Sequence, residues 1–139
     1  MVSKVQFETI TFKIFNLNKK IRFVAIISDT GKILSSKMKS EKHSLLKHEN
    51  EEKFCQDVAK RKKMRCEFDK SLGKVRYINV ERENITQIVT YINSKSIFVT
   101  IAPELTITSK ELLISKIKKI VTNLKCVVIN FLWLLPIKF

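Results

Sequence analysis

Hydrophobic and polar positions along the chain first mark a hairpin. Residues 23–28 are apolar at both alternating positions, which is typical of a strand covered on both faces. Asp29-Thr30-Gly31 then predicts a tight turn, because Asp can bond its own backbone and Gly accepts a positive φ. Residues 32–37 follow as the return strand. The pattern therefore predicts a β-hairpin whose first strand lies near the middle of a sheet.

The segments on either side of this hairpin have the pattern of helices. Apolar residues recur at helical spacing over residues 7–20, and although Ile10, Phe12 and Ile14 also alternate, the length of the segment favours a helix. A second helix is predicted over residues 49–70, with acidic residues in its first turn and Leu72-Gly73 as its stop. The polar residues 40–50 between hairpin and helix are predicted to form a loop.

The second half of the chain predicts three strands and a last helix. The strands cover residues 74–81, 85–92 and 96–102, and the turns between them are too short for crossovers, so they form an antiparallel meander. Thr108-Ser109-Lys110-Glu111 has the form of a capping box, and the buried stripe of the following helix ends near Leu124. The predicted order is helix, two strands, helix, three strands, helix, which is an α+β fold.

Composition adds a strong positive charge to this picture. The net charge is +14, from 27 Lys and Arg against 13 Asp and Glu, which favours nucleic acid, anionic lipid or acidic proteins as partners. A purely compositional origin of the charge is the competing interpretation. The three cysteines are odd in number and form no CxxC, which is typical of buried thiols in a reducing compartment. The N-terminal residues lack the apolar core of a signal peptide, so a cytoplasmic location is expected.

The quoted pattern "FVAIISDTGKILSS" and the element order resemble the roadblock (dynein light-chain) family, a branch of the profilin-like folds. "RKKMRCEF" followed by "SLG" is similar to small archaeal roadblock-like proteins of unassigned role. The resemblance covers about residues 5–125, which gives a domain of residues 1–125 and an apolar tail of residues 126–139. The middle helix is more basic than is usual in the family, and the tail lies outside the family's domain.

The resemblance implies a five-stranded antiparallel sheet with helices on both faces, the middle helix on one and the two terminal helices on the other. It also implies a homodimer that pairs its third strands edge to edge and packs its middle helices side by side. Roadblock proteins scaffold or regulate small GTPases and carry no chemistry themselves, so an archaeal, non-enzymatic regulator is expected.

Motifs for catalysis and for metal or cofactor binding are absent from the sequence. There is no GxxxxGK[ST] loop, no Cys or His spacing suited to zinc, and no hydroxyl or thiol in a recognisable nucleophile motif. His43 and His48 are five residues apart and do not align on one helix face. We therefore expect neither an enzyme nor a cofactor.

Basic residues of the middle helix, Arg61, Lys62 and Arg65, are the predicted partner-binding site. Arg61 and Arg65 are four residues apart and share a helix face beside an apolar stripe, where Arg suits bidentate contact with carboxylate or phosphate. Three interpretations stay open. The arginines rest their stems on the core with their heads in water, or they meet a protein partner or dimer mate, or they bind nucleic acid, although interleaved aromatic residues are missing.

The predicted dimer interface involves Val75, Tyr77 and Asn79, with Phe68 on the middle helix. The run "KVRYINV" mixes charged, polar and β-branched residues on both faces, as an edge strand does, and an open edge invites pairing.

The apolar tail contains Phe131, Trp133 and Leu134 and has three interpretations. Residues 127–137 would be about 16 Å long as a helix, too short to cross a bilayer core of about 30 Å. The tail packs on its own sheet or on a dimer mate, or inserts shallowly into a membrane with Trp133 at the interface, or is a divergent end.

Two functions of different class follow. The first is a non-enzymatic roadblock-like dimer that scaffolds or regulates a partner such as a small GTPase. The alternative is a basic module that binds nucleic acid or an anionic membrane surface, with nucleic acid the weaker candidate.

Overall fold

A computed structural model describes the backbone of residues 4–39 and 48–134 and the side chains of residues 4–39 and 50–123. The predicted order of elements is confirmed, with one short helix added after the middle helix. The elements are α1 (Lys4–Phe15), β1 (Ile21–Ile27), β2 (Ile33–Met38), α2 (His48–Cys66), α3 (Asp69–Leu72), β3 (Ile78–Glu81), β4 (Thr86–Ile92), β5 (Lys95–Ile101) and α4 (Ile107–Leu134). The loop predicted over residues 40–50 falls mainly on residues 40–47, outside the described residues.

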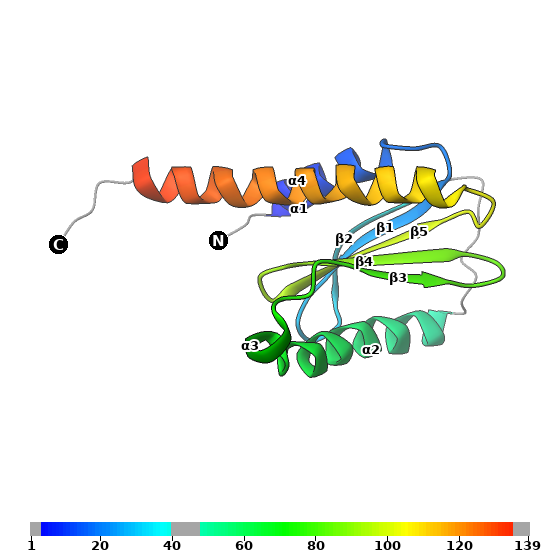
Figure 1. The fold of residues 1–139 in the computed structure, drawn as a ribbon, viewed down its shortest axis with the longest axis horizontal. Coiled ribbons are helices and arrows are strands. Elements are labelled where there is room, and N and C mark those ends of the chain that lie inside the picture. Colours follow the sequence, from blue (N-terminus) through cyan, green and yellow to red (C-terminus); the bar gives the residue numbers. More distant parts are fainter. Residues whose placement is uncertain (1–3, 40–47, 135–139) are drawn as a thin grey trace.

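A single five-stranded antiparallel sheet in the order β2-β1-β5-β4-β3 forms the centre of the molecule. Helices α1 and α4 lie on one face and α2 covers the other (Figure 1). The predicted α+β class, the antiparallel sheet and the placing of helices on both faces are thus confirmed. β1 pairs with both β2 and β5, so it is an interior strand as predicted, although β5 is the central one.

The β1–β2 turn brings the hairpin against α2. The side chain of Ser28, rather than the predicted Asp29, holds the turn, since its Oγ accepts hydrogen bonds from the backbone N–H groups of Thr30 (3.3 Å) and Lys32 (3.0 Å). Gly31 has φ +88°, and a Cβ at this position would lie 2.6 Å from Cα of Gln56 in α2. The glycine is therefore required both by the turn and by close contact with α2.

Strand β3 is shorter than predicted. It begins at Ile78 rather than at residue 74, so Val75 and Tyr77 precede the strand and only Asn79 of the predicted interface residues lies within it. The last ladder pair joins Ile78 to Val89. Beyond it, the hydroxyl of Thr90 in β4 donates to the carbonyl of Arg76 at 3.3 Å. A side chain thus takes up a backbone acceptor that a longer ladder would have used.

Helix ends also differ from the sequence prediction. α1 stops at Phe15, and Asn18 Oδ1 then accepts from the N–H of Lys20 at 2.8 Å, which favours a turn over further helix. α2 stops at Cys66, but Gly73, with φ +84°, ends the following α3 as predicted. The cap of α4 is Thr106, not Thr108, because the Thr106 hydroxyl accepts from the N–H of Ser109 at 3.2 Å.

Helix α4 continues to Leu134, past its expected end at Leu124. The tail residues Phe131, Trp133 and Leu134 belong to this helix, but their side chains lie outside the described part of the chain. The prediction of buried thiols is confirmed for one cysteine and wrong for another, while the side chain of Cys126 lies outside the described residues. Cys55 is buried, and burial raises the pKa of its thiol, whereas Cys66 is exposed because it lies on the solvent side of the end of α2.

Candidate protein-binding surface beside strand β3

Strand β3 forms one edge of the sheet and pairs only with β4 among the described residues. The backbone N–H of Arg82 donates to the carbonyl of Ile85. In an antiparallel pair, successive N–H groups of a strand face alternately toward and away from its neighbour, so this bond shows which N–H groups of β3 face β4. The N–H groups of Ile78 and Val80 therefore face β4, while those of Asn79 and Glu81 face the open edge. This edge offers unpaired backbone donors and acceptors to another strand.

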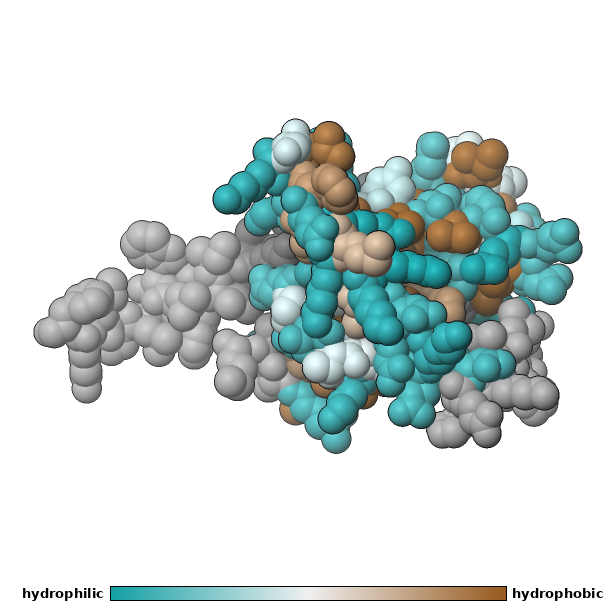
Figure 2. Space-filling view, turned by 90° about the horizontal axis from the view of Figure 1, so that it is seen from below, coloured by the Kyte–Doolittle hydropathy of each residue, from teal (hydrophilic) through white to brown (hydrophobic). Residues whose placement is uncertain are grey.

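A ridge of apolar side chains runs along the outer side of α2 and onto α3. Its members are spaced by four residues and are exposed by 62% for Met64, 57% for Phe68 and 82% for Leu72. Figure 2, which views the molecule from the α2 side, shows a strip of tan and brown side chains surrounded by hydrophilic ones. We call these three residues the α2 ridge. The sequence prediction found only Phe68, although the repeat of four residues marks all three positions.

The basic residues predicted to bind a partner are divided between two environments. The Nη1 of Arg65 donates to the hydroxyl of Tyr91 in β4 at 3.2 Å, and Nζ of Lys62 lies 5.0 Å from the centre of the same ring. Both side chains are half-buried against the sheet. Arg61 is exposed. Of the three, Arg61 is therefore the residue that a partner can approach without rearranging a contact of the fold.

The predicted interface residues lie on both layers around β3. Phe68 is on the α2 side, whereas the ring of Tyr77 lies on the α4 side, where Nζ of Lys118 is 5.8 Å from its centre. Asn79 is exposed in β3 and donates to Oε1 of Glu81 at 3.2 Å. Val75 is half-buried before the strand. The structure thus places these residues on either side of the open edge rather than in one patch.

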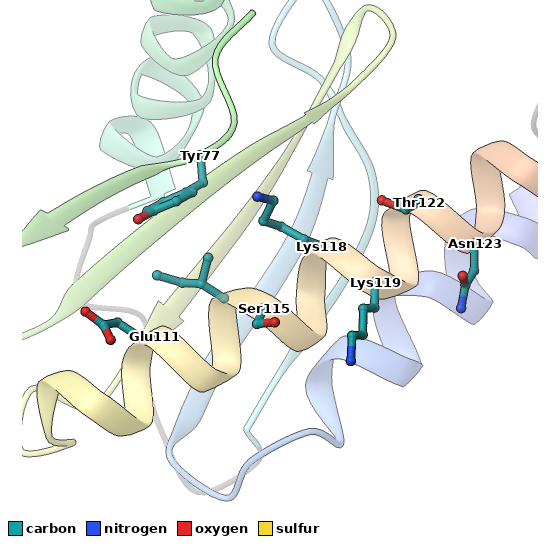
Figure 3. A pocket seen from close by; sticks show the side chains of 8 residues that line it. Tyr77, Glu111, Ser115, Lys118, Lys119, Thr122 and Asn123 are labelled. Atoms are coloured by element: carbon teal, nitrogen blue, oxygen red, sulfur yellow. The ribbon is translucent and has the colours of Figure 1, made fainter.

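An open groove of about 500 Å³ lies between Tyr77 and α4. Figure 3 shows Lys118 pointing toward Tyr77, whereas Lys119 and Asn123 point to the other side of the helix. The remaining lining residues are Glu111, Ile114, Ser115 and Thr122. The groove mixes one apolar side chain with hydroxyls and charges, and it holds no arrangement typical of a catalytic centre.

An ion pair that the sequence prediction missed secures the end of β3. Nζ of Lys110 in α4 lies 2.7 Å from Oε2 of Glu81, and the hydroxyl of Thr86 donates to the same oxygen at 2.8 Å. The hydrogen bond from Lys110 is the main cause that lowers the pKa of the Glu81 carboxyl, and Thr86 adds to it. A lysine within the apolar stripe of α4, three residues before Leu113, is the sequence signal for such a buried cation.

Two absences among the described residues bear on function. These residues contain no group of three His, Cys, Asp or Glu side chains that could hold a metal ion. Within the same residues, no helix is long and apolar enough to cross a membrane.

Solved structures of roadblock proteins share this fold. The Roadblock/LC7 domain from Streptomyces avermitilis is 11% identical with a TM-score of 0.64, and the match covers 88% of this chain and 97% of that domain. MglB from Myxococcus xanthus is 12% identical with a TM-score of 0.66, covering 89% and 90% of the two chains. An MglB with tetrameric arrangement is 11% identical with a TM-score of 0.64, covering 83% and 84%.

At this level of identity the likeness establishes the fold, which is roadblock-like as the sequence predicted. No curated protein matches the chain. A family model does match over residues 4–126, which include the sheet and its covering helices. The chain therefore belongs to DUF6659, a family of unknown function.

Proposed function

We propose that this chain is a non-enzymatic scaffold or regulator that works as a homodimer, paired through the open edge of β3. The observation that carries the proposal is the position of that edge. On the α4 layer it lies beside Tyr77, and on the other layer α3, which carries Leu72, comes directly before the segment that leads into β3. Pairing two such edges would satisfy the outward N–H groups of Asn79 and Glu81.

The direction of α2 supports pairing on this side. At about 100° per residue, Gln56 and Arg65 lie on opposite flanks of the buried face of α2 that holds Cys55 and Val58, and Arg65 donates to the hydroxyl of Tyr91 in β4. Gln56 contacts Gly31 in the turn of the β1–β2 hairpin, which forms the other side of the sheet. The Arg65 flank is therefore the one toward β4 and β3, and Phe68, whose N–H donates to the carbonyl of Arg65, follows directly after it. The α2 helix of a second copy would be its neighbour there.

A small GTPase is the partner class that the roadblock resemblance suggests. Arg61 supports an acidic protein face as the contact, because its guanidinium is exposed and is close to the apolar ridge. Charge would speed the encounter, and the ridge would contribute apolar area. The MglB with tetrameric arrangement is an example of self-association on the same fold.

Sedimentation of three proteins tests the dimer. We expect the wild type to sediment as a dimer and Asn79→Pro as a monomer, since proline removes an N–H that faces the open edge and leaves the ladder with β4 intact. Asn79→Ala is the matched control, because it changes the side chain but keeps the backbone donor, and it should remain a dimer. A wild type that stays monomeric at high concentration would overturn the proposal.

The partner site has a separate test. Arg61→Glu should leave the dimer intact and weaken capture of an acidic partner, whereas Lys53→Glu, an equal charge change at another exposed position of α2, should have a smaller effect. Equal losses from the two variants would show that net charge, not this surface, governs capture.

A further inference from the structure

Helix α4 has two parts with different surroundings. Up to Val121 it packs on the sheet and on α1 through a buried stripe of Leu113, Ile114, Ile117 and Val121. Beyond this stripe its backbone continues as a helix to Leu134 and extends past the sheet and α1 (Figure 1). Within the described residues, the second part therefore has no layer of this chain beneath it.

From residue 126 on, this second part of α4 has no polar side. Residues 126–134 read CVVINFLWL, with no charged residue and one amide, Asn130. A helix that is apolar all round requires apolar surroundings on every side. A groove on a protein covers one side of a helix, whereas lipid covers all sides, so the composition favours lipid over a second copy of the chain.

Length and charge favour one leaflet of an anionic membrane. Nine residues of helix extend about 13 Å, close to half of a bilayer core of about 30 Å. Residues 112–125, immediately before the apolar segment, contain Lys116, Lys118, Lys119 and Lys125 but no acidic residue. Lysines immediately before an apolar segment suit anionic headgroups.

Other described residues add positive charge where the extension of α4 begins. Lys116 and Lys119 are exposed on α4. At the start of α1, Lys4 is exposed and the adjacent Val5 is 70% exposed. Lys95, the first residue of β5, has its Nζ 5.7 Å from the centre of the Phe7 ring in α1, so a third element contributes a cation at this end.

We propose that residues 126–134 of α4 insert into one leaflet of an anionic membrane, with the lysines around the base of the extension held at the headgroups. The inference does not depend on pairing of β3, since it uses the part of α4 that extends beyond the sheet. It assigns the chain a membrane surface as a binding partner.

Trp133 is the single tryptophan of the chain, so its fluorescence reports on the proposed insertion alone. With the full chain, vesicles of phosphatidylcholine and phosphatidylglycerol should shift the emission to the blue, and brominated acyl chains should quench it. Vesicles of phosphatidylcholine alone should give a much weaker effect. No shift with anionic vesicles would overturn the proposal. So would emission already blue without lipid and dependent on protein concentration, because a second copy would then cover the helix.

Flotation with the same vesicles tests the lysines. Lys116→Glu with Lys119→Glu should lower the bound fraction at least about tenfold. The control, Lys60→Glu with Lys63→Glu on the exposed side of α2, changes the net charge equally, from +14 by −4 to +10, and should lower it by less than about threefold. Far-UV circular dichroism should show both variants folded. Equal losses would overturn the assignment of this end of the molecule to the membrane.

Discussion

The two faces of the sheet differ in how much hydrophobic surface they bury. Among the described side chains, the face covered by α1 and α4 has a cluster of fifteen buried hydrophobic residues, most of them Ile or Val. The cluster under α2 has six, including Ala25 and Cys55. At the same time, α2 and α3 carry the exposed ridge. We conclude that the face covered by α1 and α4 contributes most of the free energy of unfolding. The face covered by α2 buries less apolar surface and presents its helix to a partner.

The largest loss of stability should come from a change on the face covered by α1 and α4. Ile26 is fully buried in the α1/α4 cluster, so Ile26→Ala should lower the free energy of unfolding by about 2–5 kcal/mol, as loss of a buried side chain leaves a cavity. Val58→Ala in α2 should lower the free energy of unfolding by only about 1.5 kcal/mol, because it deletes two buried methyl groups. Urea denaturation measures both. A larger loss at Val58 than at Ile26 would reverse the comparison.

A second prediction concerns the contact between α2 and the β1–β2 turn. Gly31→Ala should cost about 2 kcal/mol, because a side chain is strained at φ +88° and its Cβ would also collide with the backbone of Gln56. Gly73→Ala is the matched control. Gly73 has nearly the same φ, +84°, but a Cβ there would have no neighbour within 4 Å, so only the strain of about 1 kcal/mol remains.

Thermal denaturation of both variants separates the contact from the strain. Equal losses of stability would mean that α2 does not press on the β1–β2 turn. A larger loss for Gly31→Ala would confirm that this contact positions α2 on the sheet.

The smallest effect should come from the ion pair at the end of β3. The pKa of Glu81 is lowered from its ordinary value of 4.5 by the hydrogen bond from Lys110. The pair therefore contributes stability that is fully present above about pH 4.5 and is lost as the pH falls through the lower pKa of the folded state. The contribution is small, because the Glu81 side chain is 50% exposed and water screens it.

Comparing the wild type with Glu81→Gln over pH checks this prediction. The melting temperature of the wild type should exceed that of Glu81→Gln at neutral pH, and this difference should shrink toward zero well below pH 4.5. A difference that stays constant with pH would show that the carboxylate charge contributes nothing.

The sequence predicted the layers well, because they depend on alternation and helical spacing. The two-sided apolar run of residues 23–28 placed an interior strand correctly, and the resemblance predicted which helices share a face. It failed where one side chain decides a boundary. The Thr90 hydroxyl bonds Arg76 and shortens β3, and Thr106 rather than Thr108 caps α4.

The candidate surface was predicted in part. Phe68 and Arg61 were expected at it, but Lys62 and Arg65 contact Tyr91, a residue that lies 26 or more positions away in the sequence. Such a contact depends on how α2 crosses β4, which local spacing does not specify. The ion pair between Glu81 and Lys110 is likewise formed only when β3 and α4 pack together.

Hydrogen exchange at the open edge tests the dimer most directly. The N–H groups of Asn79 and Glu81 face away from β4, so in a monomer they should exchange quickly, and in the dimer they should be protected. We predict that their protection rises with protein concentration, while the outward amides of β2, at the opposite edge, stay unprotected. Fast exchange of both amides at every concentration, or concentration-dependent protection at β2 instead, would contradict a dimer built on β3.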